Sequence, residues 1–271
     1  MSRRKKLHAD GTPVPRRTAV SRPKVPEEEL EKLEALTDTL PEALQQFRAL
    51  GIIGAERRYR IEEALRHRTR TLLPLLQGIH DPHNQAAVIR SSEALGIQEI
   101  HVVDSVKAPF RPSPRVTQST HRWTEVHVHP EPEVAVERLR ARGFSVLATA
   151  LRDDALPLHE VDFKRPTAVL LGNESTGLSE ELVDAADGAV MIPIYGLAQS
   201  YNVSVAAALT LAAAVEQRRR AWGSPGDLDE ASKALLRLRY YRSAAGRRVP
   251  PSLAVRLDEL ESSLLAAVDT D

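Results

Sequence analysis

The sequence predicts an α/β fold in which a parallel sheet is covered by helices on both faces. From Leu72 onward, short runs rich in Val, Leu and Ile alternate with helical patterns, as expected for strands that are buried on both sides. The chain has 271 residues and is 42% hydrophobic, which suffices for a sizeable core. Polar motifs also follow several expected strands, where open α/β sheets bind ligands.

Residues 1–24 are expected to form a disordered basic tail. They hold eight basic residues against one acidic residue, Asp10, and prolines are interspersed among them. Such a segment buries too little apolar area to fold. It could serve as a solubilising tail or as an arm that binds nucleic acid. No apolar run follows the basic residues, so a signal peptide is not expected.

Residues 25–70 are predicted to be a helical lead-in. Leu30, Leu33 and Leu36 recur at helical spacing, and Pro41 suits the first turn of a second helix. A further helical pattern covers 56–67 and has an arginine-rich face.

Residues 71–221 form the predicted α/β domain. Its expected strands cover 72–76, 100–103, 144–149, 168–171 and 189–192, and its expected helices cover 84–95, 132–142, 179–186 and 200–220. The helix at 200–220 is apolar nearly all round, which is typical of a helix buried on every side. The pattern fits a subunit interface and the central helix of a monomer equally well.

Residues 222–271 are expected to form a basic, helical, RNA-binding extension. After a break at 223–226, arginines alternate with tyrosines over 237–242. Guanidinium groups pair with phosphates and aromatic rings stack on bases, so this pattern favours an RNA-contacting surface. An amphipathic helix that packs on the domain would have a similar pattern.

Several classes of function are excluded or disfavoured. The chain has no cysteine, so disulfides and thiolate chemistry are excluded. The histidines lack the spacing of a helical metal site, and His127 and His129 are expected at exposed strand positions, so we expect no metal. No apolar run is long enough to span a bilayer, which predicts a cytoplasmic protein. Basic and acidic residues both number 37, so net charge indicates no partner.

Three motifs are candidates for the functional site: residues 83–90, 171–178 and 192–204. In the first, Asn84 fits an N-cap or first helical turn, and Arg90 lies on another side of that helix. In the second, Gly172 and Gly177 allow a tight turn, without the spacing of a phosphate loop. In the third, Ser200 is expected to cap the following helix.

Taken together and in order, these motifs resemble those of the SpoU family of RNA ribose 2′-O-methyltransferases. The family patterns look like Asn-x-x-x-x-x-Arg, Leu-x-Gly-x-Glu-x-x-Gly-Leu and Ile-Pro-Met-x-Gly-x-x-x-Ser-Leu-Asn-Val-Ser, and the match covers about residues 55–220. The resemblance implies a sheet that ends in a deep C-terminal trefoil knot, an exception to the rule that chains do not thread their own loops. It also implies a homodimer formed through the knot region and S-adenosyl-L-methionine as cofactor.

The resemblance further implies roles for individual residues. The catalytic positions would be Arg90, Asn84, Glu174, Ser200 and Asn202. Arg90 would lower the pKa of the ribose hydroxyl, with an RNA phosphate accepting the proton. Asn84 would hold Arg90 or the ribose, and Glu174 would anchor the arginine. Cofactor contacts are implied for Thr149, Gly172, Ile192, Leu197 and Tyr201, mostly through backbone groups, and RNA contacts for Arg60, Arg218 and Arg220.

The chain departs from the family pattern at a few positions. Tyr201 stands where leucine is usual and Ile194 where methionine is usual, which changes the shape of the cofactor pocket. Glu216-Gln217-Arg218 stands where the family has Arg-Gln-Arg, which displaces charge at the RNA face. Overall the resemblance is greatest to the members that methylate guanosine 18 of tRNA. The alternatives are the same chemistry on ribosomal RNA, or a knotted RNA-binding protein that does not catalyse.

Overall fold

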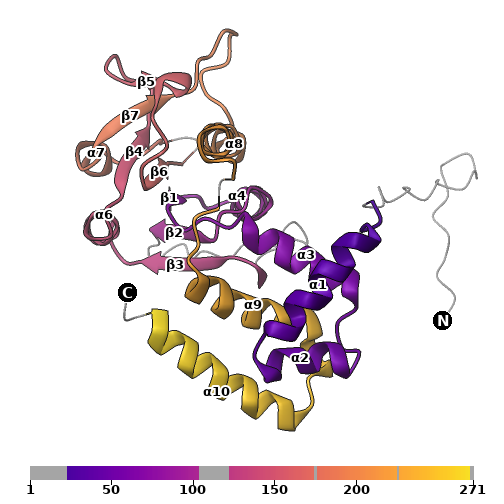
Figure 1. Ribbon diagram of the computed structural model, residues 1–271. Helices are drawn as coiled ribbons and strands as arrows, with labels where there is room; N and C mark the ends of the chain where they lie inside the picture. Colours follow the sequence, from indigo (N-terminus) through magenta and orange to yellow (C-terminus); the bar gives the residue numbers. More distant parts are fainter. Residues whose placement is uncertain (1–22, 104–121, 174–175, 225, 269–271) are drawn as a thin grey trace, which may run out of the picture.

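The computed structural model describes residues 23–103, 122–173, 176–224 and 226–268. Its centre is a seven-stranded sheet of order β3-β2-β1-β6-β4-β7-β5, in which every paired strand is parallel to its neighbour (Figure 1). The strands are β1 (Leu72–Gln77), β2 (Glu99–Val103), β3 (Glu125–His129), β4 (Ser145–Thr149), β5 (Leu156–Pro157), β6 (Thr167–Leu171) and β7 (Gly188–Met191). The predicted α/β class with a parallel sheet is therefore confirmed.

Helices cover both faces of this sheet, as predicted. Helices α4 (Pro82–Ala94) and α8 (Val203–Trp222) pack on one face, and α6 (Pro132–Ala141) and α7 (Glu180–Asp184) on the other (Figure 1). Successive side chains of each strand point to opposite faces of the sheet. Leu72 and Leu76 therefore belong to the core beneath α4 and α8, whereas Leu73 and Leu75 belong to the core beneath α6.

The helical segments at the two ends of the chain lie together beside β2 and β3. Helices α1 (Glu27–Thr39), α2 (Glu42–Ala49) and α3 (Ala55–Arg66) pack with α9 (Glu230–Ala245) and α10 (Pro251–Val268) (Figure 1). One hydrophobic core joins them, with Phe47, Leu65, Tyr241 and Leu257 fully buried in it. Two short 3₁₀ helices, η2 (Leu158–Glu160) and η3 (Gly246–Arg248), lie in connections.

Strands β3 and β5 are not among the five strands expected from apolar runs, although His127 and His129 of β3 were expected at strand positions, and one helix starts later than predicted. Strands β3 and β5 carry no apolar run, because both are edge strands with one side open to solvent. The predicted exposure of His129 is also wrong, since this side chain is 3% exposed. Helix α8 begins at Val203 rather than at Ser200, because Asn202 caps it.

The connection between η2 and β6 crosses the carboxyl-terminal part of α8. The amide group of Gln217 accepts a hydrogen bond from the backbone N–H of Phe163 at 2.6 Å and donates one to the carbonyl of Val161 at 2.9 Å. Helix α8 also packs against α4, β1 and β6. It therefore contacts both the sheet and the 158–166 connection, which comprises η2 and the segment that leads from it to β6.

A polar cluster lies on the α6 face of β2 and β3. His101 Nδ1 and His129 Nε2 are 2.8 Å apart, and His101 Nε2 is 3.2 Å from a carboxylate oxygen of Glu99. Burial alone raises the pKa of Glu99, but hydrogen bonds from His101 and Arg142 hold that pKa well below its usual value. Burial, together with the charges of His101 and Arg138, lowers the pKa of His129 to about 4.

Within the described ranges, one group of three histidine or acidic side chains lies close enough together to hold a metal ion, and it belongs to this cluster. Ligand atoms of Glu99, His101 and His127 lie within 4.8 Å of one another. The Glu99 carboxylate, however, pairs with the guanidinium groups of Arg70 and Arg142. Two adjacent cations oppose the binding of a third positive charge. We therefore interpret the cluster as an ion-pair network.

Across the described ranges, no helix has both the length and the apolar character needed to cross a membrane.

Because the pKa of His129 is lowered in the folded chain, the free energy of unfolding should decrease as the pH decreases. An unfolded histidine titrates near pH 6.5, so between about pH 6.5 and 4 protons bind the unfolded chain preferentially. The free energy of unfolding should fall by about 1 to 2 kcal/mol from pH 7 to pH 5 on account of His129. Urea unfolding at pH 7, 6 and 5 gives the free energy of unfolding at each pH. In His129→Gln, where residue 129 cannot titrate, the slope of this free energy against pH should be shallower. Equal slopes in both proteins would contradict this assignment.

Candidate active site

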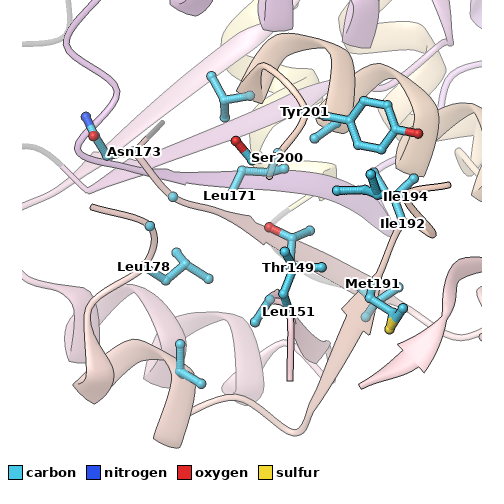
Figure 2. A pocket seen from close by; sticks show the side chains of 17 residues that line it. Thr149, Leu151, Leu171, Asn173, Leu178, Met191, Ile192, Ile194, Ser200 and Tyr201 are labelled. Atoms are coloured by element: carbon cyan, nitrogen blue, oxygen red, sulfur yellow. The ribbon is translucent and has the colours of Figure 1, made fainter. Parts of the chain in front are cut away.

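The carboxyl ends of β4, β6 and β7 surround a cavity of about 330 Å³. Thr149 reaches it from β4, Leu171 from β6 and Met191 from β7, and Figure 2 shows their side chains converging. The other lining residues are Ala150, Leu151, Gly172, Asn173, Gly177, Leu178, Val183, Val190, Ile192, Ile194, Ser200, Tyr201, Val203 and Ala206. No Asp, Glu, Lys or Arg is among these lining residues. The cavity therefore suits a largely uncharged group.

The turn after β6 depends on a close contact between two backbone segments. Asn173 and Gly177 exchange backbone hydrogen bonds of 3.0 and 2.9 Å, which close the turn into a ring. A Cβ atom on Gly172 would lie 2.4 Å from backbone atoms of Gly177 and Leu178. Only glycine at 172 permits this approach, and Gly177 has a positive φ of 71°. The two glycines of the second motif thus shape this wall of the cavity.

The same turn is fixed to the end of β1. Gln77 donates to the hydroxyl of Ser179 and accepts from its backbone N–H, both at 2.9 Å. The side-chain N–H of Asn173 donates to the carbonyl of Gly78 at 2.7 Å. These bonds hold the second motif beside the loop that leads into the first. A second hollow, lined in part by Gln77, His80 and Asn173, lies between the two motifs.

The first and third motifs meet through two asparagines. Asn202 accepts hydrogen bonds from the backbone N–H groups of Ser204 and Val205, so it caps α8. Its side-chain N–H donates to the side-chain oxygen of Asn84 at 3.2 Å. Asn84 lies in the first turn of α4, where the sequence predicted it, and Asp81 is the cap. The predicted capping role of Ser200 is wrong, and Ser200 instead lines the cavity.

The structure brings together some of the predicted catalytic residues and separates another. Ser200 lies at the cavity and Asn202 contacts Asn84. Arg90 lies on the exposed side of α4 and does not line the cavity of its own chain. This placement agrees with the expectation that Asn84 and Arg90 face different directions. Glu174 lies outside the described residues.

Four of the five predicted cofactor residues line the cavity: Thr149, Gly172, Ile192 and Tyr201. The Thr149 hydroxyl donates to the carbonyl of Leu170 at 2.7 Å, which orients it at the end of β4. Leu197 is the exception, since its side chain is fully exposed and is not part of the lining. Sequence reasoning missed Leu178 and Met191 as lining residues, because an apolar residue beside a strand end gives no signal beyond that of the core.

The predicted RNA contact of Arg218 is wrong. Its side chain is wholly buried, and its guanidinium donates to the carbonyls of Thr71, Phe163 and Arg165 and to the hydroxyls of Thr69 and Thr71. Burial lowers the pKa of Arg218, and the nearby Asp227 carboxylate raises it. Every N–H of the Arg218 guanidinium has a protein partner. This side chain therefore links α8 to the start of β1 and to the 158–166 connection.

The other two predicted RNA contacts lie nearer to solvent. The guanidinium of Arg60 is 3.6 Å from the carboxylate of Glu56, and its side chain is 31% exposed. Arg220 pairs with Glu216 at 2.9 Å and its side chain is 76% exposed. Both remain accessible to a phosphate, so their RNA contacts stay predictions.

The arginines of α9 pair with acidic residues of neighbouring elements, and its tyrosines are buried. Arg237 pairs with Glu62, Arg239 with Glu125 and Glu261, and Arg242 with Asp258 and Glu261. Tyr240 and Tyr241 are buried. The structure thus favours the alternative of a packed amphipathic helix over an RNA-contacting surface at this segment.

Known proteins match this chain over the region just described. The model of the SpoU rRNA methylase family matches residues 72–212. A tRNA (guanosine(18)-2′-O)-methyltransferase of Thermus thermophilus is 46% identical over 168 residues, which are 61% of this chain and 84% of that protein. A 23S rRNA (guanosine-2′-O-)-methyltransferase of Acinetobacter baylyi is 32% identical over 160 residues, 58% and 64% of the two proteins.

A solved structure also resembles the chain. The structure described as the A. aeolicus TrmH/SpoU tRNA modifying enzyme superposes with a TM-score of 0.64 at 29% sequence identity, over 69% of this chain and 96% of that one. The matched fold is therefore nearly the whole of that protein.

The burial of Arg218 predicts a large loss of stability on its removal. Arg218→Ala leaves five backbone or hydroxyl acceptors and Asp227 without their cation, so the free energy of unfolding should fall by about 3 to 5 kcal/mol. Arg220→Ala, two residues further along the same helix, should change it by less than about 0.5 kcal/mol. Guanidinium chloride unfolding of both variants measures this difference. Similar values for the two would contradict a structural role for Arg218.

Proposed function

The chain belongs to the SpoU rRNA methylase family, and we propose that it methylates the 2′-hydroxyl of guanosine 18 in tRNA. The chain is an RNA methyltransferase, since the family model covers half of it and its relatives are named tRNA 2′-O-methyltransferases. The choice of tRNA rests on identity, which is 46% to the tRNA enzyme and 32% to the ribosomal RNA enzyme.

We infer that the cavity holds the adenosine part of S-adenosyl-L-methionine. Among the described residues, its lining is largely apolar and includes no charged side chain, which suits an uncharged purine, and its walls are backbone turns that offer N–H and C=O groups. Thr149, Gly172, Ile192 and Tyr201 would hold the cofactor there, and Leu197 would contribute through its backbone alone. When bound, the cofactor supplies an electrophilic methyl group on a sulfonium centre.

The residues around the cavity prepare the acceptor oxygen. A guanidinium stays protonated and is therefore a poor base, so Arg90 acts by stabilising the developing negative charge on the ribose oxygen. The proton passes to a phosphate oxygen of the RNA. Asn202 holds Asn84 in place by their hydrogen bond, and Asn84 orients the ribose or Arg90. Glu174 is proposed to pair with Arg90.

We further propose a knotted chain and a homodimer. Near its carboxyl-terminal end, α8 is bonded both to the 158–166 connection, through Gln217, and to Thr71 at the start of β1, through Arg218, and these contacts on two chain segments support a helix that has passed through a loop. Helix α8 leaves Val205 and Leu209 more than 40% exposed, and these apolar side chains suit a subunit interface. Because Arg90 does not line the cavity of its own chain, it would act on the ribose held beside the cavity of the partner.

The observation that best supports the proposed function is the meeting of the three motifs at one end of the sheet. The test is methyl transfer from tritiated S-adenosylmethionine to purified tRNA and ribosomal RNA transcripts, with the product mapped by mass spectrometry. We expect label at guanosine 18 of tRNA and none in a transcript with adenosine at that position. Label in ribosomal RNA alone would overturn the substrate assignment, and no cofactor binding would indicate a non-catalytic RNA-binding protein.

Arg90→Ala should reduce turnover by at least about 100-fold, because the developing charge loses its guanidinium. The dissociation constant of S-adenosylhomocysteine, measured by calorimetry, should stay within about twofold, since Arg90 does not line the cavity. Arg138→Ala removes an exposed arginine from α6, on the other face of the sheet, and serves as the control. Unchanged turnover in Arg90→Ala would remove Arg90 from the mechanism.

The same variant tests whether Arg90 acts across a dimer. Gly172→Ala should close the cavity, because the added Cβ overlaps the backbone of Gly177. In a mixed dimer of Arg90→Ala and Gly172→Ala subunits, the open cavity belongs to the Arg90→Ala subunit and the intact arginine to the Gly172→Ala subunit. The two form a complete site only if Arg90 acts on its partner. Recovery of activity on mixing is expected, and its absence would place Arg90 in its own subunit's site.

A further inference from the structure

The loop between β7 and α8 forms one wall of the cavity with little packing to hold it. Every residue from Tyr195 to Asn202 is exposed, and Tyr195 and Leu197 project almost wholly into solvent. Ile194 and Tyr201, near the two ends of this loop, nevertheless line the cavity. The loop must therefore keep its shape by other means than a buried core.

One side-chain hydrogen bond joins the two ends of this loop. The Tyr201 hydroxyl donates to the carbonyl of Pro193, eight residues earlier, at 3.3 Å. Figure 2 shows the ring of Tyr201 beside Ile194 and Ile192, on the same side of the cavity. The tyrosine thus supplies part of the wall with its ring and closes the loop with its hydroxyl.

We propose that the Tyr201 hydroxyl is a clasp that shapes the 193–201 loop for the adenosine part of the cofactor. The identity of the ligand rests on the proposed function. Tyr201 is a positioning residue, since the hydroxyl acts on the loop through Pro193. The clasp is a property of this chain, because the leucine usual at this position in the family pattern has no donor.

The physical effect of the clasp is preorganisation. An open loop must lose conformational freedom when it orders around a ligand, and this cost weakens binding. A bond that joins residues 193 and 201 before binding removes part of that cost. Pro193 adds to the effect, because its ring fixes φ at one side of the acceptor carbonyl. The hydroxyl should therefore strengthen cofactor binding without contributing to the transfer step.

Tyr201→Phe removes the hydroxyl and keeps the ring. Calorimetry with S-adenosylhomocysteine should give a dissociation constant raised about three- to tenfold, the range of one intramolecular hydrogen bond. The KM for S-adenosylmethionine should rise by a similar factor with kcat little changed. Hydrogen exchange of the cofactor-free protein should be faster in peptides covering 192–202. The Tm should change by less than about 1 °C, because the loop contributes little packing.

The matched control is Tyr195→Phe, which removes another hydroxyl from the same loop. Tyr195 is 94% exposed and does not line the cavity, so binding of S-adenosylhomocysteine should be unaffected. Tyr201→Leu should bind at least as weakly as Tyr201→Phe, because it loses both the hydroxyl and the ring.

Three results would overturn the clasp. Wild-type affinity in Tyr201→Phe would show that the hydroxyl has no role, and wild-type exchange of the loop would show that it does not order the loop. A Tm lowered by several degrees would show a general structural role. In each case the wild-type protein still binds the cofactor and methylates RNA, so the proposed function stands. Failure of the wild type to bind S-adenosylhomocysteine would instead overturn the proposed function.

Discussion

The position of α8 depends on the guanidinium of Arg218, which joins this helix to the backbone of β1 and of the 158–166 connection. A cation buried to this extent is tolerated only when all its donors are paired, and here every one is. With α8 fixed, its cap Asn202 reaches Asn84 at the start of α4, and the loop before it reaches the ends of β6 and β7. Three motifs that are distant in sequence thus form one site because α8 is fixed at its carboxyl-terminal end by this buried cation and along its length by the packing of Ala207, Leu211 and Ala214 in the core.

Within that frame, the cavity is shaped by backbone rather than by charged side chains. Gly172 lets the two arms of the turn in the second motif approach each other closely. Hydrogen bonds of Gln77 and Asn173 hold this turn at the end of β1. A site of this kind recognises a ligand by shape and by main-chain hydrogen bonds. Asn202 follows the lining residue Tyr201 and contacts Asn84, whereas Arg90 is directed outward from its own chain, so these three groups stand outside the lining.

The sequence was most informative where a pattern had one physical cause. Apolar runs on both faces identified the central strands. Gly172, Thr149, Ile192 and Tyr201, which the family resemblance implied as cofactor contacts, all line one cavity. Edge strand β3 carries no apolar run, since its sequence alternates polar residues with two valines. The role of Arg218 was predicted wrongly, and that of the α9 arginines was left between two alternatives, because basic residues on a helix look alike whether they bind RNA or acceptors of the protein itself. Pairing across the fold, which local sequence does not encode, decides between the two.

The internal pairing of these arginines bears on how the protein would meet RNA. The chain has equal numbers of basic and acidic residues, and α9 directs its arginines to Glu62, Glu125 and Glu261. A guanidinium already paired with a carboxylate offers little net charge to a phosphate, so these groups stabilise the helical core rather than attract nucleic acid. Arg60 and Arg220 are also paired, but with glutamates of their own helices, Glu56 and Glu216, and Arg220 is 76% exposed. Exposed pairs of this kind are weak, so their arginines can exchange the carboxylate for a phosphate. We therefore propose that the attraction comes from such arginines and from the eight basic residues within 1–24, which would let a protein without net charge bind RNA.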